Sequence, residues 1–194
     1  VIFDSDFVPE KCFLKEIVKP FVADSNVACV QAKWNYLNVG QNKISKFASS
    51  ILMVYHHLLA PINERRGVSL LFGSAEAVRA STLRKLGGWK DWSMTEDVEF
   101  TLRALKNGYK TVYLKDLNVP GEVPFNLRSL AKQQKRWAFG NAKAFFDNSN
   151  IADNNNVTCT RMDVFLSNPA NIADRHTLQI LNIRIKVLIG QFIQ

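Results

Sequence analysis

Two aspartates near the start of the chain have the spacing of a cation-binding pair. An apolar run over residues 1–3 is typical of a buried strand, and Asp4 and Asp6 follow it directly. Side chains at positions i and i+2 of an extended segment point to the same side, so the two carboxylates can converge on one hard cation. In open α/β sheets, ligands also bind at the carboxyl ends of strands. Because Asp-x-Asp is common in turns as well, the pattern alone leaves a plain turn as the alternative.

A second group of carboxylates falls in the first turn of a helix that is predicted to begin after Ser93 or Thr95, both possible N-caps, and to end before Gly108. The apolar residues at i, i+4 and i+7 spacing give this helix one buried face: Val98, Leu102 and Leu105. Glu96 and Asp97 then lie at its N-terminus, where each acid stabilises the helix dipole by about 0.3–1 kcal/mol. Taken alone, the acids need no role beyond this one.

A polar and aromatic cluster lies on a basic amphipathic helix that is predicted over residues 126–146. Gln133, Arg136 and Trp137 are spaced at i, i+3 and i+4, which places them on one face. Arg offers a planar pair of donors for phosphate, and Gln offers both a donor and an acceptor. Trp offers a flat apolar surface on which a sugar ring can stack. The alternative is a basic surface helix with one buried Trp.

The elements that must position these residues alternate between helices and strands. Apolar periodicity and the placement of Gly and Pro predict further helices over residues 9–21, 44–59 and 76–86, and strands over residues 27–32, 67–73 and 109–114. Trp34 either lines a pocket or packs in the core. His56 and His57 point about 100° apart on a helix, and we interpret them as surface or interface residues.

The remaining segments are predicted to be irregular. Residues 116–125 contain Pro and Gly and are predicted to form a loop, and the polar, Asn-rich residues 147–160 a linker. The pattern over residues 178–192 fits an amphipathic helix and, in part, a strand, so it predicts neither.

The composition favours one globular domain with anionic partners. The 194 residues are 47% hydrophobic, and no stretch approaches the roughly 18 uncharged apolar residues that span a bilayer. The net charge of +8 suits nucleotide phosphates, acidic lipid headgroups or nucleic acid, but no nucleic-acid motif accompanies it. Three cysteines without metal or redox spacing are expected to be reduced thiols.

Six motifs taken together resemble a known family of enzymes. They are Asp4-Ser5-Asp6, Gln31-x-x-Trp34, Phe72-Gly73-Ser74, Gly87-Gly88-Trp89, Thr95-Glu96-Asp97 and Gln133-x-x-Arg136-Trp137. Their order and approximate spacing resemble the inverting GT-A glycosyltransferases of family two, in the branch of the cellulose and mannan synthases. The resemblance implies an α/β fold, a partial GT-A domain with a Rossmann-like mixed sheet flanked by helices.

The resemblance covers residues 1 to about 146 and also implies a domain organisation. Residues 1–146 would form the C-terminal portion of the catalytic domain, and residues 147–194 a linker and tail. The half that binds the nucleotide base would precede Val1. A chain of this extent is therefore expected to have little or no transferase activity alone.

The resemblance assigns roles to single residues. Asp97 matches the general base, and Asp4 and Asp6 match the pair that holds Mg²⁺ or Mn²⁺ and the nucleotide diphosphate, with Asp6 the more direct ligand. The residues that match or adjoin substrate-binding motifs are Gln133, Arg136, Trp137, Gly73, Ser74, Glu96 and Trp34. The Phe-Gly-Ser at residues 72–74 departs from the more usual Asn-Gly-Thr, which affects the expected contacts with the acceptor.

The implied function is transfer of a sugar, with inversion, from a UDP- or GDP-sugar to a hydroxyl of a saccharide or lipid acceptor. The resemblance further implies a catalytic domain on the cytoplasmic side of a membrane, attached through segments outside this chain, with no nucleic-acid partner. Two alternatives remain open. A non-catalytic basic binding module explains the charge but leaves Asp4, Asp6 and Asp97 unexplained, and an inactive glycosyltransferase fragment explains the motifs without turnover.

Overall fold

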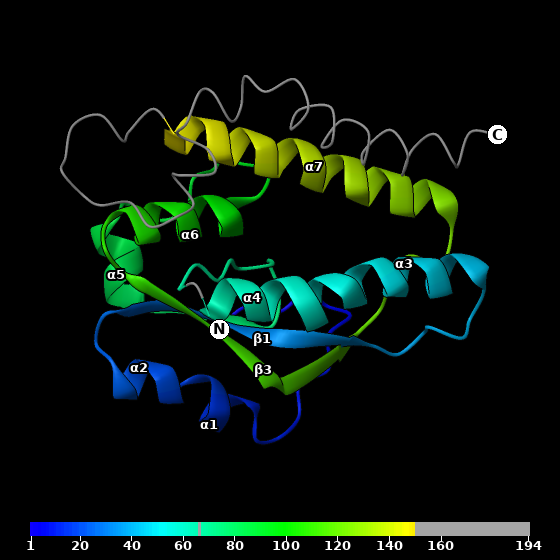
Figure 1. Ribbon diagram of the computed structural model, residues 1–194, viewed down its shortest axis with the longest axis horizontal. Coiled ribbons are helices and arrows are strands. Elements are labelled where there is room, and N and C mark those ends of the chain that lie inside the picture. The colour runs from blue at the N-terminus through cyan, green and yellow to red at the C-terminus, as the bar shows by residue number, and fades with distance from the viewer. Residues whose placement is uncertain (66, 150–194) are drawn as a thin grey trace. The chain divides into compact units, whose positions relative to one another are not determined.

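The computed structural model describes residues 1–65 and 67–149, which belong to one compact unit (Figure 1). Within these residues, three strands form a sheet in the order β2-β1-β3. The central strand β1 (Val27–Tyr36) pairs in parallel with β3 (Lys110–Gly121) and antiparallel with the short β2 (Glu76–Val78). The predicted mixed sheet is therefore present.

Burial explains why β1 is the central strand. The predicted strand over residues 27–32 is confirmed and extends to Tyr36, and its apolar side chains are buried on both faces, as is usual for a strand with a parallel partner. These side chains contribute to two clusters. One contains Phe13 and Ile17, and the other contains Phe100 and Ala104.

The strand β3 is longer than predicted, because it continues through most of the predicted loop at residues 116–125. The pairing with β1 shifts between Leu114 and Asn118, so the intervening residues bulge out of the ladder. Pro120 is tolerated because β3 lies at an edge of the described sheet, and its carbonyl accepts a hydrogen bond from Val8 N at 2.9 Å. The segment that was predicted to be a loop therefore forms a β-bulge and an edge position of strand β3.

The helix predicted over residues 9–21 is two short helices, α1 (Phe13–Ile17) and α2 (Lys19–Ala23). Phe13 and Ile17 are buried, whereas Val18, at the break between the two helices, is 42% exposed. Pro20 lies in the first turn of α2, where Pro is tolerated, and does not end a helix.

The helix predicted over residues 44–59 begins at Lys43 and continues past Pro61. It consists of α3 (Lys43–Val54), a π-helical turn η1 (Tyr55–Leu59) and α4 (Ala60–Arg65). A proline ring clashes with the carbonyl four residues before it and lacks the N–H that would bond there. The wider turn precedes Pro61 directly, and Ala60 N donates to Tyr55 O, five residues back, so the helix accommodates the proline instead of ending.

The apolar run at residues 67–73 is largely buried but is not a strand, so that prediction was wrong. The strand β2 lies further along, where the predicted helix 76–86 was to begin, and only α5 (Ala80–Lys85) remains of that helix. An apolar run indicates burial, but it does not indicate whether a hydrogen-bonding partner strand lies beside it.

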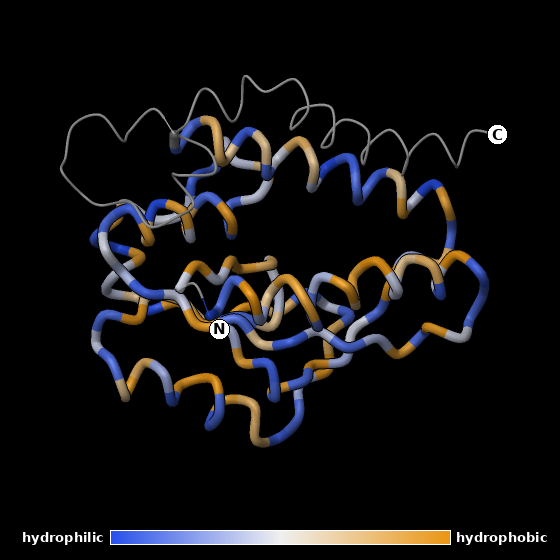
Figure 2. The backbone as a smooth tube through the Cα atoms, viewed as in Figure 1, coloured by the Kyte–Doolittle hydropathy of each residue, from blue (hydrophilic) through white to orange (hydrophobic). Residues whose placement is uncertain are grey.

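Two helices that carry sequence motifs are confirmed: α6 (Glu96–Lys106) and α7 (Leu127–Ser149). In Figure 1, α5, α6 and α7 lie on the side of the sheet opposite to α1 and α2. Figure 2 shows the alternation of hydrophilic and hydrophobic positions along α7. That helix continues three residues past its predicted end, and Lys143 and Asp147 form an ion pair there at 2.6 Å. The rest of the predicted linker and the pattern at 178–192 lie outside the described residues.

Candidate active site

A cavity of about 570 Å³ brings together residues that are far apart in the sequence. It is bounded by the segment after residue 3, by β1, by the α3–η1 segment, by the loop at residues 70–73, by the N-terminal end of α6 and by the middle of α7. Its lining includes nine of the ten predicted site residues: Asp4, Asp6, Trp34, Gly73, Glu96, Asp97, Gln133, Arg136 and Trp137. The tenth, Ser74, lies behind the wall, where its Oγ accepts a hydrogen bond from Asp4 N at 2.9 Å.

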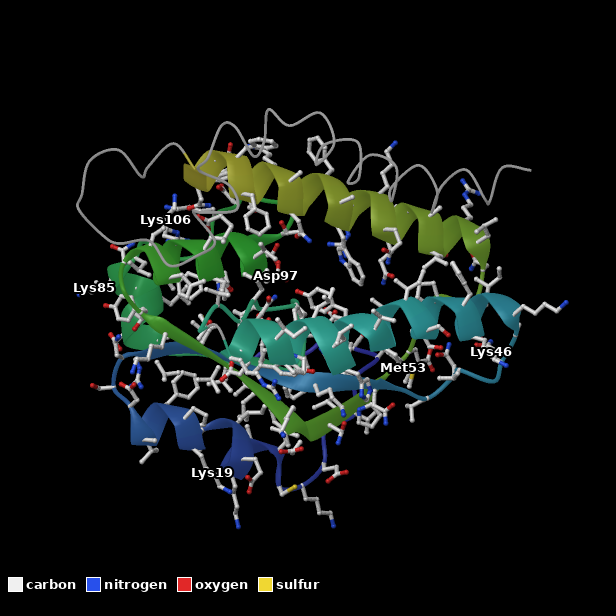
Figure 3. The ribbon with its side chains drawn as sticks, viewed as in Figure 1. Lys19, Lys46, Met53, Lys85, Asp97 and Lys106 are labelled. Atoms are coloured by element: carbon white, nitrogen blue, oxygen red, sulfur yellow. The ribbon has the colours of Figure 1, made fainter. Side chains whose placement is uncertain are left out.

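Asp97 is the second residue of α6 and lies partly buried in the cavity wall. Figure 3 labels it at the N-terminal end of that helix, between α6 and the α3–α4 layer of the view. Burial, with a smaller contribution from the neighbouring Glu96, raises the pKa of Asp97 to about 6. Hydrogen bonds from backbone N–H groups at the helix start and the positive charge of Arg136 oppose that rise. A carboxylate with a pKa this close to neutrality suits general-base chemistry.

Asp4 and Asp6 lie together at one part of the lining, but not at the end of a buried strand as predicted. Val1 is 56% exposed, and Ile2 makes a single antiparallel bridge with Glu76 instead of a ladder. Burial and the charge of Asp6 raise the pKa of Asp4, and the nearby Arg136 opposes the rise.

The chemistry of the aspartate pair fits a hard divalent cation. Two carboxylates that repel each other are a favourable environment for such an ion, which prefers oxygen ligands. Within residues 1–65 and 67–149, no group of three or more acidic, His or Cys side chains could hold a metal. A cation at Asp4 and Asp6 would therefore need oxygen ligands from elsewhere, such as a diphosphate.

Side chains from other elements hold the loop at residues 72–75 in place. Gln31 Nε2 and Trp34 Nε1 both donate to Ser74 O at 2.9 Å, and Gln31 Oε1 accepts from Phe72 N at 2.9 Å. Gly73 has a φ of 85°, and a Cβ built on it would lie 3.4 Å from Asp97 Oδ2. The loop thus lies beside Asp97, and its positive φ at residue 73 is a conformation that favours glycine.

The predicted face of α7 points into the same cavity. The Trp137 ring lies 6.5 Å from the Trp34 ring, so Trp34 both lines the cavity and packs against aromatic neighbours. Gln133 Oε1 is buried and has no hydrogen-bond partner within the described part of the chain. Arg136 opposes the raised pKa values of both Asp4 and Asp97, so its guanidinium is close enough to act on both carboxylates.

Gly140 sets the distance between α7 and the start of α6. A Cβ built on Gly140 would lie 2.6 Å from Thr95 Cγ2, which is closer than any ordinary contact. Thr95 is buried and immediately precedes the helix that carries Asp97. The absence of a side chain at this position therefore lets α7 pack directly over the helix end that presents Asp97.

Sequence reasoning missed three buried polar residues near the cavity. His56 was interpreted as a surface residue, but it is 2% exposed and lies 4.9 Å from the Phe72 ring and 5.2 Å from the Trp34 ring. Burial lowers its pKa to about 3, so it is neutral. Tyr36 and Glu76 are buried as well. The sequence prediction took residues 55–59 as regular α-helix and residue 76 as the start of a helix. Neither element would point the side chain of His56 or of Glu76 inward.

Comparisons with known proteins show the family to which the chain belongs. Residues 1–181 match the family described as "Glycosyl transferase family group 2". The chain belongs to this family of glycosyltransferases. The predicted resemblance is thereby confirmed at the level of the family.

The curated relatives with similar sequences are plant mannosyltransferases. The "Probable glucomannan 4-beta-mannosyltransferase 3" of Oryza sativa subsp. japonica is 36% identical over 150 residues, which cover 74% of this chain and 26% of that protein. The "Glucomannan 4-beta-mannosyltransferase 2" of Arabidopsis thaliana is 33% identical over 146 residues, which cover 75% of this chain and 27% of that protein. The chain therefore spans about a quarter of the length of these relatives.

A solved structure with a similar fold is the "Mannosyltransferase PcManGT from Pyrobaculum calidifontis in complex with GDP-Man and Mn2+". The TM-score is 0.59 at 19% sequence identity, and the likeness covers 79% of this chain and 39% of that one. It confirms the predicted fold class, a mixed α/β arrangement of the GT-A type that matches part of the larger chain. None of the helices within the described residues has the length and apolar content to cross a membrane.

Proposed function

We propose that this chain contributes the acceptor side and the catalytic base of an inverting sugar transferase. The observation that carries the proposal is Asp97, whose pKa burial raises to about 6 in the wall of a cavity shared with Asp4, Asp6 and Arg136. A base, a cation-binding pair and a guanidinium are the groups that transfer from a nucleotide sugar requires. The membership of residues 1–181 in a glycosyltransferase family supports the same conclusion.

In the proposed reaction, Asp97 accepts the proton of an acceptor hydroxyl while the hydroxyl oxygen forms a bond to the anomeric carbon. The bond from that carbon to the diphosphate oxygen breaks on the opposite face, and its electron pair leaves with the nucleoside diphosphate. A positioned base typically contributes about 10²–10⁴-fold to such a step. In-line displacement needs one base and no covalent intermediate, so the configuration inverts.

The remaining lining residues hold the reactants. Asp6, with Asp4 beside it, would hold Mg²⁺ or Mn²⁺, which neutralises negative charge on the leaving diphosphate. Arg136 acts on the same charge from α7 through a planar pair of donors. Trp137 provides a flat face for an acceptor sugar ring, and the unpaired Gln133 Oε1 is available to accept from a sugar hydroxyl. Gly73, Ser74, Glu96 and Trp34 shape the wall around them.

We infer a GDP-sugar, GDP-mannose in the first instance, as the donor and a β-linked mannan as the acceptor. The relatives named above are glucomannan mannosyltransferases, and the structural neighbour holds GDP-Man and Mn²⁺. We also propose residues 1–146 as the C-terminal portion of the catalytic domain, with the domain on the cytoplasmic side of a membrane. UDP-sugars and lipid acceptors remain within the same reaction class.

The test is sugar transfer by the full-length protein, with GDP-mannose and UDP-glucose compared as donors and a manno-oligosaccharide as acceptor. We expect Mn²⁺- or Mg²⁺-dependent release of GDP together with a β-linked product, and loss of both in Asp97→Asn. Salt-dependent binding of DNA or of anionic vesicles, without any turnover, would instead favour the basic binding module. Donor binding without turnover would favour an inactive glycosyltransferase.

A further inference from the structure

One buried acid faces the candidate base from behind the cavity wall. Glu76, the first residue of β2, is 1% exposed and does not line the cavity. Its backbone is fixed by the pairing of β2 with Gln31 of β1 and by the bridge to Ile2. Because strand partners hold the Glu76 main chain on both sides, the Glu76 side chain starts from a fixed position beneath the loop at residues 72–75.

The Glu76 carboxyl group binds the backbone of that loop. Its Oε2 accepts hydrogen bonds from Gly73 N at 2.9 Å and from Phe72 N at 3.2 Å. Phe72 N also donates to Gln31 Oε1, whereas Gly73 N has Glu76 as its acceptor within residues 1–65 and 67–149. Gly73 is also the residue next to Asp97, because a Cβ built on it would lie 3.4 Å from Asp97 Oδ2. The chain of contacts therefore runs from Glu76 through Gly73 to Asp97.

We propose that Glu76 is a positioning residue of the transfer reaction, whose buried carboxyl group holds the Phe72–Gly73 backbone against Asp97. The inference rests on the proposed function, since it assigns Glu76 a task in that reaction. Glu76 touches neither the cavity nor a substrate, so it acts through the loop and is not itself catalytic.

The charges around Glu76 decide which of the two acids is ionised. Burial, together with the charges of Asp97 and Glu96, raises the pKa of Glu76 to about 8, against the opposing effect of the hydrogen bonds from Gly73 N and Phe72 N. The Cys29 thiol of β1 also interacts with the charge of Glu76. Burial raises the pKa of this thiol far above neutrality, so the thiol is uncharged. Between about pH 6 and pH 8, Asp97 is ionised and Glu76 is a neutral acid whose Oε2 still accepts both N–H groups.

The decisive comparison is between Glu76→Gln and Glu76→Ala in the full-length protein. Gln is neutral, has nearly the same shape and keeps an oxygen for the two N–H groups, so kcat at pH 7 should stay within about 2-fold of wild type. Ala removes the acceptor and releases the loop, so kcat should fall by about 10-fold or more, with an unchanged KM for the donor. Hydrogen exchange of the Gly73 amide should be faster in Glu76→Ala and unchanged in Glu76→Gln.

The pH profile adds a readout that a purely structural role would not move. In wild type, kcat should fall above about pH 8, because ionised Glu76 places a second negative charge near Asp97 and so opposes the negative charge that develops on the leaving diphosphate. Glu76→Gln should lose this alkaline fall and keep the rise near pH 6. Glu64→Gln is the matched control, because Glu64 is also a partly buried acid that accepts a backbone N–H, from Tyr113, but it does not line the cavity. That variant should keep both limbs.

The outcomes separate the inference from the proposed function. If wild type transfers sugar and Glu76→Ala keeps its kcat, or Glu76→Gln loses as much as Glu76→Ala at pH 7, the positioning role is wrong. Should Glu76→Ala not fold, an unchanged alkaline limb in Glu76→Gln overturns the inference. If the wild-type protein transfers no sugar at all, the proposed function fails. The Gly73 amide then decides whether Glu76 holds the loop, since unchanged exchange in the Ala variant refutes it.

Discussion

Replacing Asp97 with Asn is expected to stabilise the fold at pH 7 while it removes transferase activity. Burial raises the pKa of Asp97 from 3.8 to about 6, so the ionised form is less favourable in the folded state than in the unfolded chain. One pKa unit corresponds to about 1.4 kcal/mol, so the carboxylate destabilises the fold by about 3 kcal/mol at pH 7. Asn is neutral and its side-chain oxygen can still accept a backbone N–H at the helix start.

The pH dependence of this difference follows from the direction of the shift. The folded state binds the Asp97 proton more tightly than the unfolded chain, so wild type loses stability relative to Asp97→Asn as the pH rises from about 4 to about 6. Below about pH 4 both side chains are neutral and the difference should vanish. Urea unfolding of both proteins at pH 3.5, 5 and 7.5 measures it directly.

The same substitution should lower kcat by at least about 10²-fold, because Asn cannot accept the proton. Affinity for the nucleotide should be nearly unchanged, since Asp4, Asp6 and Arg136 carry that binding. Glu96→Gln is the control: it removes an acid from the same helical turn, but Glu96 is exposed, and we expect a smaller effect on kcat. If Asp97 were only an acid that complements the helix dipole, Asp97→Asn would destabilise the fold by at most about 1 kcal/mol and retain turnover. That result would refute the assignment.

Three further substitutions test other parts of the site. Asp6→Ala should abolish the Mn²⁺-dependent increase in nucleoside diphosphate affinity measured by calorimetry, and an unchanged increase would reject Asp6 as a ligand. Arg136→Ala should weaken diphosphate binding and move the acidic limb of kcat/KM to higher pH, because Arg136 lowers the pKa of Asp97; a limb that stays in place would contradict this. Gly140→Ala should reduce the unfolding free energy by about 1–3 kcal/mol despite the better helix propensity of Ala, because its Cβ would meet the stiff, buried Thr95. Adding Thr95→Ser should recover part of that loss, and a Gly140→Ala protein more stable than wild type would show that α7 does not pack as described.

Sequence periodicity predicted the helices that bury one apolar face. The ends of the helices that carry Asp97 and Trp137 were predicted to within a few residues. Each helix has an apolar stripe and residues typical of helix ends, and both features are visible in the local sequence. The strand β1 was found because a run buried on both faces is mostly apolar, with Gln31 as the polar exception within residues 27–32. The predicted site residues converge on one cavity even though no sequence rule fixes the distances between them.

The errors share a physical cause, which is that local patterns do not report hydrogen-bonding partners. The run at 67–73 is apolar enough for a strand, but Phe72 N and Gly73 N are bonded to side chains rather than to a neighbouring strand. The predicted helix over residues 44–59 ended before Pro61, whereas the wider turn η1 accommodates the proline and helps to bury His56. Glu76 was assigned to a helix, and its inward direction follows only from the pairing of β2 with β1.

The way in which the 72–75 loop is held has a consequence for how acceptor preference can change over evolutionary time. Its main chain is anchored by Gln31, Trp34 and Glu76, all of which lie outside the three-residue motif that begins it. The side chain at position 72 is therefore not needed to keep the loop in shape, and here it is a Phe that packs 4.9 Å from the His56 ring. Under the proposed function, exchange of the residue at this position would alter the chemistry that an incoming sugar meets while the loop beside Asp97 stays fixed. New specificities can thus arise in single steps, without insertions and without rebuilding the sheet.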